Sequence, residues 1–368
     1  MVIAGQDNKK HVRPVFFQKR TSKGGAQTCL LRLLSHPSIL ARSPLLIVGE
    51  SSGWLIQEAR ELGIEVFYQN FPSSRAVWSR LYLNSKFARN VRNKLKKGSY
   101  YFFANDHQES LLTLYAAKLL TCPSGVILRS PSMGKSDYEK YKCADHDFIA
   151  SVSIRYAEKF QKWESEKSIQ TLCDGLLSNE FYELTDLKEE LPKKILVIGS
   201  HLKWKGWRDL VDALNLLQNN IHHELSFDFT GDLPSVIDND LELNRLNKIK
   251  VNFLGRVEKF IELAQGYQLI VNPSRQETFG MALLEVVAAG VPVITSDAGV
   301  AADVVDRQFV YEAGDFKALA DMLENVFFKW PNIAWNGSRQ QANIRKKFMI
   351  DDSAQLLINI LDRHQISS

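Results

Sequence analysis

The sequence predicts an α/β protein with two doubly wound parallel sheets. Short runs rich in β-branched and aromatic residues alternate with longer stretches of helical periodicity, which is typical of βαβ units with helices on both faces of a sheet. The alternation restarts after a charged segment with a proline, residues 186–194. At 368 residues the chain is also longer than one ordinary core supports. We therefore expect an N-terminal domain over residues 1–185, a C-terminal domain over 186–345, and a C-terminal helix over 346–368 that packs back on the N-terminal domain.

The first half of the chain is expected to supply six strands. A polar loop, residues 19–25, separates the first strand from a helix over 26–34, and a second helix is expected over 54–62. The expected strands cover residues 12–18, 43–49, 65–68, 100–104, 125–128 and 148–152.

The second half repeats this organisation. Strands are expected at residues 195–199, 225–230, 251–254, 269–271 and 292–295, and helices at 207–217, 261–265, 281–289 and 316–327. Ligands of doubly wound sheets bind beyond the carboxyl ends of the strands. We therefore expect the functional site in the cleft between the domains.

Composition and charge limit the classes of protein. Residues 1–185 contain 26 Lys and Arg against 17 Asp and Glu, a net charge of +9, whereas residues 186–368 contain 20 against 25, a net charge of −5. This asymmetry indicates two domains with different partners. The four cysteines have no CxxC spacing, which argues against a zinc site and a disulfide scaffold. Neither a secretory signal nor a membrane-length apolar run is recognised, and the scattered cysteines fit a reduced compartment. We therefore expect a cytoplasmic location, either free or peripheral at the inner face of the membrane.

The most informative segment runs from Asn272 to Thr295. A strand ends before it, a Pro-Ser turn follows, and Gly280 lets the backbone bend into the helix 281–289. The first amides of a helix carry partial positive charge and suit a phosphate. Glu277 precedes this helix and Glu285 lies within it; eight residues at ~1.5 Å each separate them by ~12 Å, roughly the reach from a sugar to a ribose across a diphosphate.

This segment resembles the retaining glycosyltransferases of family 4, which have the GT-B fold. Their signature is P-S-x-x-E-x-F-G, then a second Glu, then A-x-G-x-P-V. The chain supplies the corresponding residues in order: Pro273, Ser274, Glu277, Phe279, Gly280, Glu285, Ala288, Gly290, Pro292 and Val293.

The resemblance implies a donor site in the C-terminal domain. Glu277 would hold hydroxyls of the donor sugar, Glu285 the nucleotide ribose, and Lys205, in a G-x-x-x-x-x-K-G loop, the diphosphate. Glu277 and Lys205 are the expected catalytic residues. The implied donor-binding set is Gly24, Gly25, Lys205, Arg256, Glu277, Phe279, Gly280, Met281, Ala282 and Glu285.

One position departs from the family pattern. Ser200 stands where the family has an arginine, so a second cation would come from His201, Lys203 or Arg275, or be missing. On the acceptor side, the candidates for substrate contact are His107 and Arg129, each after an expected strand, together with His201. The alternative for the first two is a hydrogen-bonded structural residue at a strand end.

No metal and no cofactor are expected beyond the nucleotide sugar, which is a co-substrate. Two DxD patterns, Asp145-His-Asp147 and Asp238-Asn-Asp240, lack the context of a metal-binding DxD. GT-B enzymes do not need such a motif.

The segment 75–97 contains eight Lys and Arg and no acidic residue, with Trp78, Leu81, Phe87, Val91 and Leu95 between them. One interpretation is an interfacial helix that binds anionic lipid. The other is an ordinary helix with a core face and a solvated basic face. No nucleic-acid-binding module accompanies these residues.

The function that follows from the resemblance is retaining transfer of a hexose from a nucleoside diphosphate sugar to a glycan or lipid-linked acceptor. Cell-surface polysaccharide or lipopolysaccharide synthesis is the expected process. Two alternatives stay open: a GT-B-fold nucleotide-sugar epimerase, and a non-catalytic sugar-nucleotide-binding protein.

Overall fold

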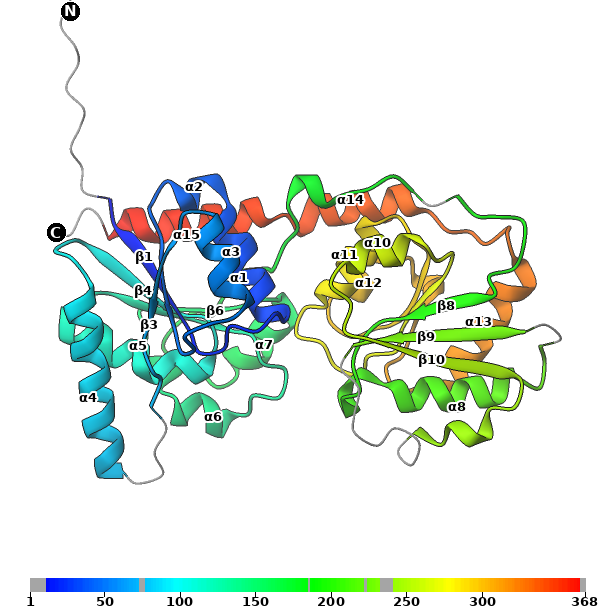
Figure 1. The fold of residues 1–368 in the computed structure, drawn as a ribbon, viewed down its shortest axis with the longest axis horizontal. Coiled ribbons are helices and arrows are strands. Elements are labelled where there is room, and N and C mark those ends of the chain that lie inside the picture. The colour runs from blue at the N-terminus through cyan, green and yellow to red at the C-terminus, as the bar shows by residue number, and fades with distance from the viewer. Residues whose placement is uncertain (1–10, 73–76, 185, 222–223, 232–240, 365–368) are drawn as a thin grey trace, which may run out of the picture. The chain divides into compact units, whose positions relative to one another are not determined.

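The computed structural model describes residues 11–72, 77–184, 186–221, 224–231 and 241–364, with backbone alone for 77–81. The chain divides into two compact units (Figure 1). Unit 1 comprises Met1–Gly175 and Ile350–Ser368, and unit 2 comprises Leu176–Met349. The fold class expected from the sequence is confirmed, because each unit is built around one parallel sheet.

Unit 1 has a seven-stranded sheet in the order β3-β2-β1-β4-β5-β6-β7, and every neighbouring pair is parallel. The strands are β1 (Arg13–Gln18), β2 (Leu45–Val48), β3 (Glu65–Tyr68), β4 (Tyr100–Ala104), β5 (Ser124–Leu128), β6 (Phe148–Ser151) and β7 (Gln170–Thr171). The helices are α1 (Gly25–Ser35), α2 (Pro37–Leu40), α3 (Trp54–Glu61), α4 (Val77–Lys94), α5 (His107–Leu120), α6 (Lys135–Lys140), α7 (Ile154–Gln161) and α15 (Ile350–Arg363).

Unit 2 has a six-stranded parallel sheet in the order β10-β9-β8-β11-β12-β13. The strands are β8 (Lys194–Val197), β9 (Leu225–Thr230), β10 (Ile249–Gly255), β11 (Ile270–Asn272), β12 (Val293–Ser296) and β13 (Val310–Tyr311). The described helices are α8 (Trp207–Leu217), α10 (Phe260–Gln265), α11 (Met281–Ala288), α12 (Ala301–Val304), α13 (Phe316–Lys329) and α14 (Gly337–Lys347).

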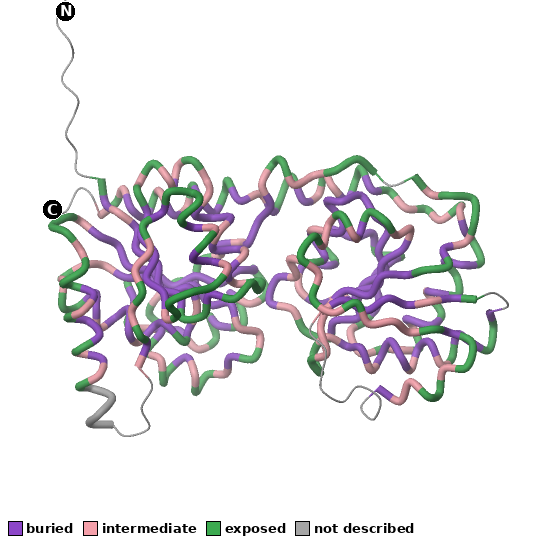
Figure 2. The backbone as a smooth tube through the Cα atoms, in the orientation of Figure 1, coloured by how far each residue is buried: buried purple, intermediate pink, exposed green. Residues whose placement is uncertain are grey.

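Both sheets are doubly wound. In chain order the unit 2 strands run 3-2-1-4-5-6, the order of a Rossmann fold, and the switch point lies between β8 and β11. Helices cover both faces of each sheet, and Figure 2 shows the strands buried at the centre of each unit. The buried strands read as continuous apolar runs, as β2 (LLIV) does, because both faces are covered.

Helix α15 belongs to unit 1 although it follows unit 2 in the chain. Its side chains Ala354, Leu357 and Leu361 are fully buried. Arg42, just after α2, donates to Asp362 Oδ1 at 2.7 Å, which fixes the far end of the helix. The expected third segment, 346–368, therefore contains the end of α14 as well as α15, and the chain passes from unit 2 to unit 1 at Met349–Ile350.

The charged segment 186–194 does not separate the two units. It lies within unit 2, where the indole Nε1 of Trp330 donates to the carbonyl oxygens of Lys188 and Glu190 at 2.9 and 3.0 Å. Residues 176–184, which we expected in the N-terminal domain, also pack in unit 2, since Tyr182 N donates to Ala288 O at 2.9 Å.

Helix α4 corrects one expectation about the basic segment. Phe87 and Val91 are buried in the core of unit 1, and Leu95 packs against that core. These side chains are therefore not available to enter a lipid surface; Trp78 and Leu81 lie outside the described side chains. The basic residues Lys86, Arg89, Arg92, Lys94, Lys96 and Lys97 are exposed. Within the described ranges, no helix is long and apolar enough to cross a bilayer.

Candidate functional site

The candidate donor site lies in unit 2, at the carboxyl ends of β8 and β11. These two strands are neighbours, with Ile270 opposite Leu196 and Val271 opposite Val197. The loops that follow them therefore leave the sheet side by side at its switch point, where doubly wound sheets bind ligands.

Gly206 fixes the loop after β8 against the loop after β11. Its φ is +69°, and an added Cβ would lie 1.8 Å from the carbonyl oxygen of Pro273, so only glycine fits. The backbone N–H of Arg275 also donates to Trp204 O at 2.7 Å. These contacts hold Lys205 beside the Pro-Ser turn that the sequence singled out.

Lys205 and Glu277 form an ion pair in which Nζ lies 2.5 Å from Oε1. Their side chains are 23% and 17% exposed, so the pair is shielded yet open to a ligand. The expected catalytic residues, 72 positions apart in the chain, thus meet in the structure. Such a charge-assisted contact is stronger than a neutral hydrogen bond.

A buried polar chain supports Glu277 from the sheet side. The Ser274 hydroxyl lies 3.0 Å from Oε1 of Glu277 and 2.9 Å from Oδ1 of Asn272. Asn272 in turn donates to Thr295 Oγ1 at 3.1 Å. All three supporting residues are buried. Sequence reasoning gave no role to Asn272 and Thr295; their signal was two polar residues at the ends of neighbouring apolar strands.

Helix α11 begins at Gly280, whose φ of +108° requires glycine at the N-cap. The first turn contains no acidic residue, and the amides of Met281 and Ala282 have no acceptor within the helix. The N-terminus of α11 therefore carries a partial positive charge that no acidic residue of its own first turn offsets. Glu285 is half-buried one turn further along.

Phe279, which the resemblance placed in the donor-binding set, has a buried side chain. Its ring packs edge-on against Phe348 at 5.3 Å between centroids. Its carbonyl oxygen accepts from Val300 N at 2.9 Å and so fixes the turn into α11. The side chain therefore contributes to packing and is not exposed to a ligand.

The candidates for a second cation are dispersed. His201 packs against the Trp207 ring with 5.6 Å between centroids. Lys203 is exposed. Arg275 is bound by the buried carboxylate of Asp209, with Nε 2.6 Å from Oδ2, while its own side chain is half exposed. Arg256 is exposed immediately after β10.

In unit 1, two carboxylates fix the loop between β1 and α1. Glu109 Oε1 accepts from the backbone N–H of Lys19 at 2.9 Å, and Glu50 Oε2 accepts from that of Thr21 at 2.7 Å. The loop ends in Gly24 and Gly25, both exposed, and a Cβ added to Gly25 would contact nothing. The Gly-Gly pair is therefore accessible at the helix start.

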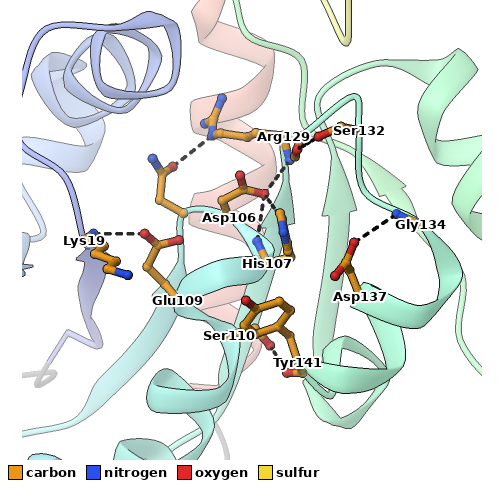
Figure 3. A network of polar contacts seen from close by, with 12 residues as sticks. Lys19, Asp106, His107, Glu109, Ser110, Arg129, Ser132, Gly134, Asp137 and Tyr141 are labelled. Carbon is orange, nitrogen blue, oxygen red and sulfur yellow. Dashed lines mark hydrogen bonds and ion pairs between the residues drawn. The ribbon is translucent and has the colours of Figure 1, made fainter. Parts of the chain in front are cut away.

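His107 and Arg129 belong to a buried polar network of unit 1 (Figure 3). Asp106 Oδ1 lies 2.9 Å from Nδ1 of His107 and accepts from Arg129 N at 3.2 Å. The Arg129 guanidinium donates to Asn105 at 3.0 Å and forms an ion pair with Asp174. Both residues are thus engaged in contacts within unit 1, which fits the structural alternative.

The pKa values of His107 and Glu109 in this network are shifted. Burial lowers the pKa of His107, but the hydrogen bond and charge of Asp106 outweigh it, so the pKa lies above its ordinary value. Burial, with the charge of Asp106, raises the pKa of Glu109 to about 7. The second carboxyl oxygen of Glu109 has no hydrogen-bond partner among the described residues. A carboxyl that titrates near neutrality therefore fixes the Lys19 loop.

Neither DxD pattern forms a described metal centre. Asp147 Oδ2 accepts from Ser124 N at 2.8 Å, and Asp145 lies near Lys118 and Lys142. Asp238 and Asp240 lie outside the described residues. Over the part of the chain that the structure describes, no three His, Cys, Asp or Glu side chains are grouped to hold a metal.

Comparison with known proteins finds a family match within the C-terminal half of the chain and relatives over about half of its length. Residues 192–327 match the family described as Glycosyl transferases group 1. The chain is 30% identical over 187 residues to N-acetyl-alpha-D-glucosaminyl L-malate synthase of Bacillus anthracis, covering 48% of this chain and 49% of that protein. It is 26% identical over 118 residues to the lipopolysaccharide core biosynthesis mannosyltransferase LpsB of Rhizobium meliloti, covering 31% and 34%. The chain thus spans about half or less of the length of these curated relatives.

Solved structures extend the likeness to nearly the whole chain. Anabaena Alr3699/HepE, solved with UDP and glucose, superposes with a TM-score of 0.78 at 17% identity, over 96% of this chain and 100% of that one. At this identity the likeness concerns the fold. With two Rossmann-like units, each around its own parallel sheet, this chain has the GT-B fold.

Proposed function

We propose that this chain, whose residues 192–327 match the family Glycosyl transferases group 1 and which has a GT-B fold, is a retaining hexosyltransferase. It would move a hexose from a nucleoside diphosphate sugar to a glycan or lipid-linked acceptor, in the synthesis of cell-surface polysaccharide or lipopolysaccharide. The observation that carries the proposal is the Lys205–Glu277 pair beside the start of α11.

Lys205 and Glu277 would contact different parts of the donor. Departure of the nucleoside diphosphate adds negative charge to its terminal phosphate, which Lys205 and the amides of Met281 and Ala282 would stabilise. Glu277 would accept hydrogen bonds from sugar hydroxyls. Because Lys205 already contacts Glu277, donor binding inserts the phosphate next to a cation that is oriented beforehand, and little reorganisation is needed.

The reaction needs no additional oxidant or metal for its balance. The bond between the anomeric carbon and the diphosphate oxygen breaks, and the acceptor oxygen forms a bond to the same carbon from the same face. The acceptor proton passes to the departing phosphate oxygen. No protein carboxylate is assigned as a nucleophile, so we propose no covalent intermediate.

We propose a uridine nucleotide as the donor carrier, because the structurally similar HepE was solved with UDP. Glu285, in the second turn of α11, would hold the ribose, and the loop with Arg256 would lie beside the base. LpsB is a mannosyltransferase of lipopolysaccharide core biosynthesis by name, which favours a surface glycan as acceptor.

A thermal-shift panel of UDP, GDP, ADP and their sugars, followed by donor turnover, tests this proposal. A ligand that binds the folded state raises its melting temperature. We expect stabilisation by UDP and slow hydrolysis of one UDP-sugar without acceptor. Release of an epimerised free sugar would instead establish an epimerase. Stabilisation without any turnover, with candidate acceptors present, would establish a binding protein.

We also propose that the exposed basic residues of α4 and the following turn attract the chain to anionic membranes. Phe87 and Val91 of this segment are buried and Leu95 packs against the core, whereas Tyr82 is exposed, so the attachment would rest mainly on charge. Each basic residue near an anionic surface contributes ~1 kcal/mol, and salt screens it.

Vesicle sedimentation tests this membrane proposal. Binding should require anionic lipid, weaken with added salt, and fall in a variant with Arg89, Arg92, Lys94, Lys96 and Lys97 changed to Gln. Salt-insensitive binding, or equal binding of both proteins, would contradict it and favour a soluble acceptor.

A further inference from the structure

A hollow lies in unit 2 at the opposite end of the sheet from Lys205 and Glu277. It has a volume of about 580 Å³, which is within the ~300–1,000 Å³ range of small-molecule sites. Its lining comes from the starts of the neighbouring strands β8, β9 and β10. Because the strands are parallel, their starts share one edge, whereas the candidate donor site occupies the other. The hollow is therefore separate from that site.

Four lysines line this hollow: Lys193, Lys194, Lys248 and Lys250. All four are exposed, and among the described residues none of their ammonium groups has a carboxylate within ion-pair distance. Glu224 supplies the one acidic side chain of the lining, so the formal charge is +3.

The positive charge of this lining is opposite in sign to the net charge of the C-terminal half of the chain. Residues 186–368 carry 20 Lys and Arg against 25 Asp and Glu, yet the hollow gathers four cations around a single anion. Like charges that line one hollow repel one another, and a bound anion would offset this repulsion. Arg208 and Arg245, on another part of unit 2, are by contrast paired with Asp212 and Glu242.

The arrangement of the lysines limits the ligand. One pair belongs to the start of β8 and the other to the start of β10, with β9 between them. Two strand spacings place the pairs about 10 Å apart at the backbone. A ligand that neutralises both pairs carries more than one anionic group. Ammonium groups bind phosphate as point charges, and Ser226 adds a hydroxyl between them.

We propose that this hollow, defined by Lys193, Lys194, Lys248 and Lys250, binds a free ligand with two or more phosphate groups. The shared chemistry is a polyphosphorylated group; we assign it to a small free molecule, and the vesicle arm of the experiment below distinguishes this from a lipid headgroup. The assignment stands independently of the proposed transferase activity, since it uses none of the donor-site residues.

Lysine acylation mapped by mass spectrometry tests the site residue by residue. The full chain is treated with an N-hydroxysuccinimide ester with and without inorganic tripolyphosphate, and in a parallel arm with phosphatidylglycerol vesicles. Tripolyphosphate should protect the four lysines of the hollow. Lys188, Lys317, Lys329 and Lys346, exposed on other segments of the same unit, should keep their reactivity. Protection of Lys205 would report the donor site separately.

Calorimetry on matched variants supplies the second measurement. The variant K193Q/K194Q/K248Q/K250Q should bind tripolyphosphate at this site about tenfold or more weakly, and K188Q/K317Q/K329Q/K346Q, with the same change in charge, should bind as the wild type does. Equal protection of both lysine sets, equal weakening in both variants, or protection by vesicles alone would overturn the proposal. If Lys205 variants lose donor turnover while tripolyphosphate still protects the four lysines of the hollow, the proposal for the hollow is unaffected.

Discussion

The substitution Glu277→Gln replaces one carboxylate oxygen with an amide nitrogen and so tests the charge of Glu277 separately from its size. In Glu277→Gln the side chain keeps its length, and its carbonyl oxygen can still accept from Ser274, now 3.0 Å away. The contact with Lys205 at 2.5 Å loses its negative partner. Hydrogen bonds to charged groups contribute about 1.5–3 kcal/mol, and both side chains are less than a quarter exposed, so we expect a loss of about 1–2 kcal/mol of stability.

The effect on turnover should exceed the effect on stability. If Lys205 is no longer held where the leaving phosphate develops charge, the loss compares with removal of one oxyanion donor, about 10²–10³ in kcat. The assay is donor turnover at saturating UDP-sugar, with a thermal melt to verify folding. The melting temperature should fall by only a few degrees, since 1 kcal/mol corresponds to about 2–4 °C in a domain of this size.

Glu262→Gln is the matched control. Glu262 also pairs with a lysine, Lys259, at 3.2 Å, but these side chains are 67% and 77% exposed. This variant should keep wild-type turnover and stability, because exposed pairs contribute little. Near-wild-type turnover of Glu277→Gln, or an equal loss in both variants, would refute the role given to the Lys205–Glu277 pair.

Three further outcomes are expected. Glu285→Ala should weaken UDP binding more than it changes sugar preference, and titration calorimetry that finds equal UDP affinity in both proteins would contradict this. Turnover should survive EDTA; complete loss restored by Mn²⁺ or Mg²⁺ would point to a metal site. Burial raises the pKa of Glu109 from 4.5 to about 7, so between these pH values the folded state holds a proton that the unfolded state releases. The stability of the wild type should therefore decline relative to that of Glu109→Gln between about pH 4.5 and 7, by up to about 3 kcal/mol. Above pH 7 the difference should be constant, and urea unfolding of both proteins across this range, with the exposed Glu61→Gln as control, measures it.

The apolar strands could be predicted because burial on both faces leaves an unambiguous pattern, as in β2 (LLIV) and β4 (YYFFA). The strands β7 and β13 were not expected, since two residues each carry no periodicity. The membership of α15 in unit 1 could be expected only in outline. Its partners, such as Arg42, lie more than 300 residues away and leave no local signal.

The site shows the same division between local and distant information. The position of Gly280 between the Pro-Ser turn and an apolar run indicates the start of α11, and its positive φ could be predicted from the sequence. The contact between Lys205 and Glu277 depends on which strands become neighbours, and spacing along the chain does not show that. The burial of Phe87 and Val91 likewise depends on which face of α4 meets the core, and this decides against their entry into a lipid surface.

The return of α15 to unit 1 sets an order of completion during synthesis. The ribosome makes residues 176–349 before residues 350–363, so unit 2 has all of its sequence while unit 1 still lacks a helix. Until that helix emerges, the surface that receives Ala354, Leu357 and Leu361 stays open to water or to a chaperone. Unit 1, which is translated first, is therefore completed last, because its final helix follows the whole of unit 2 in the chain.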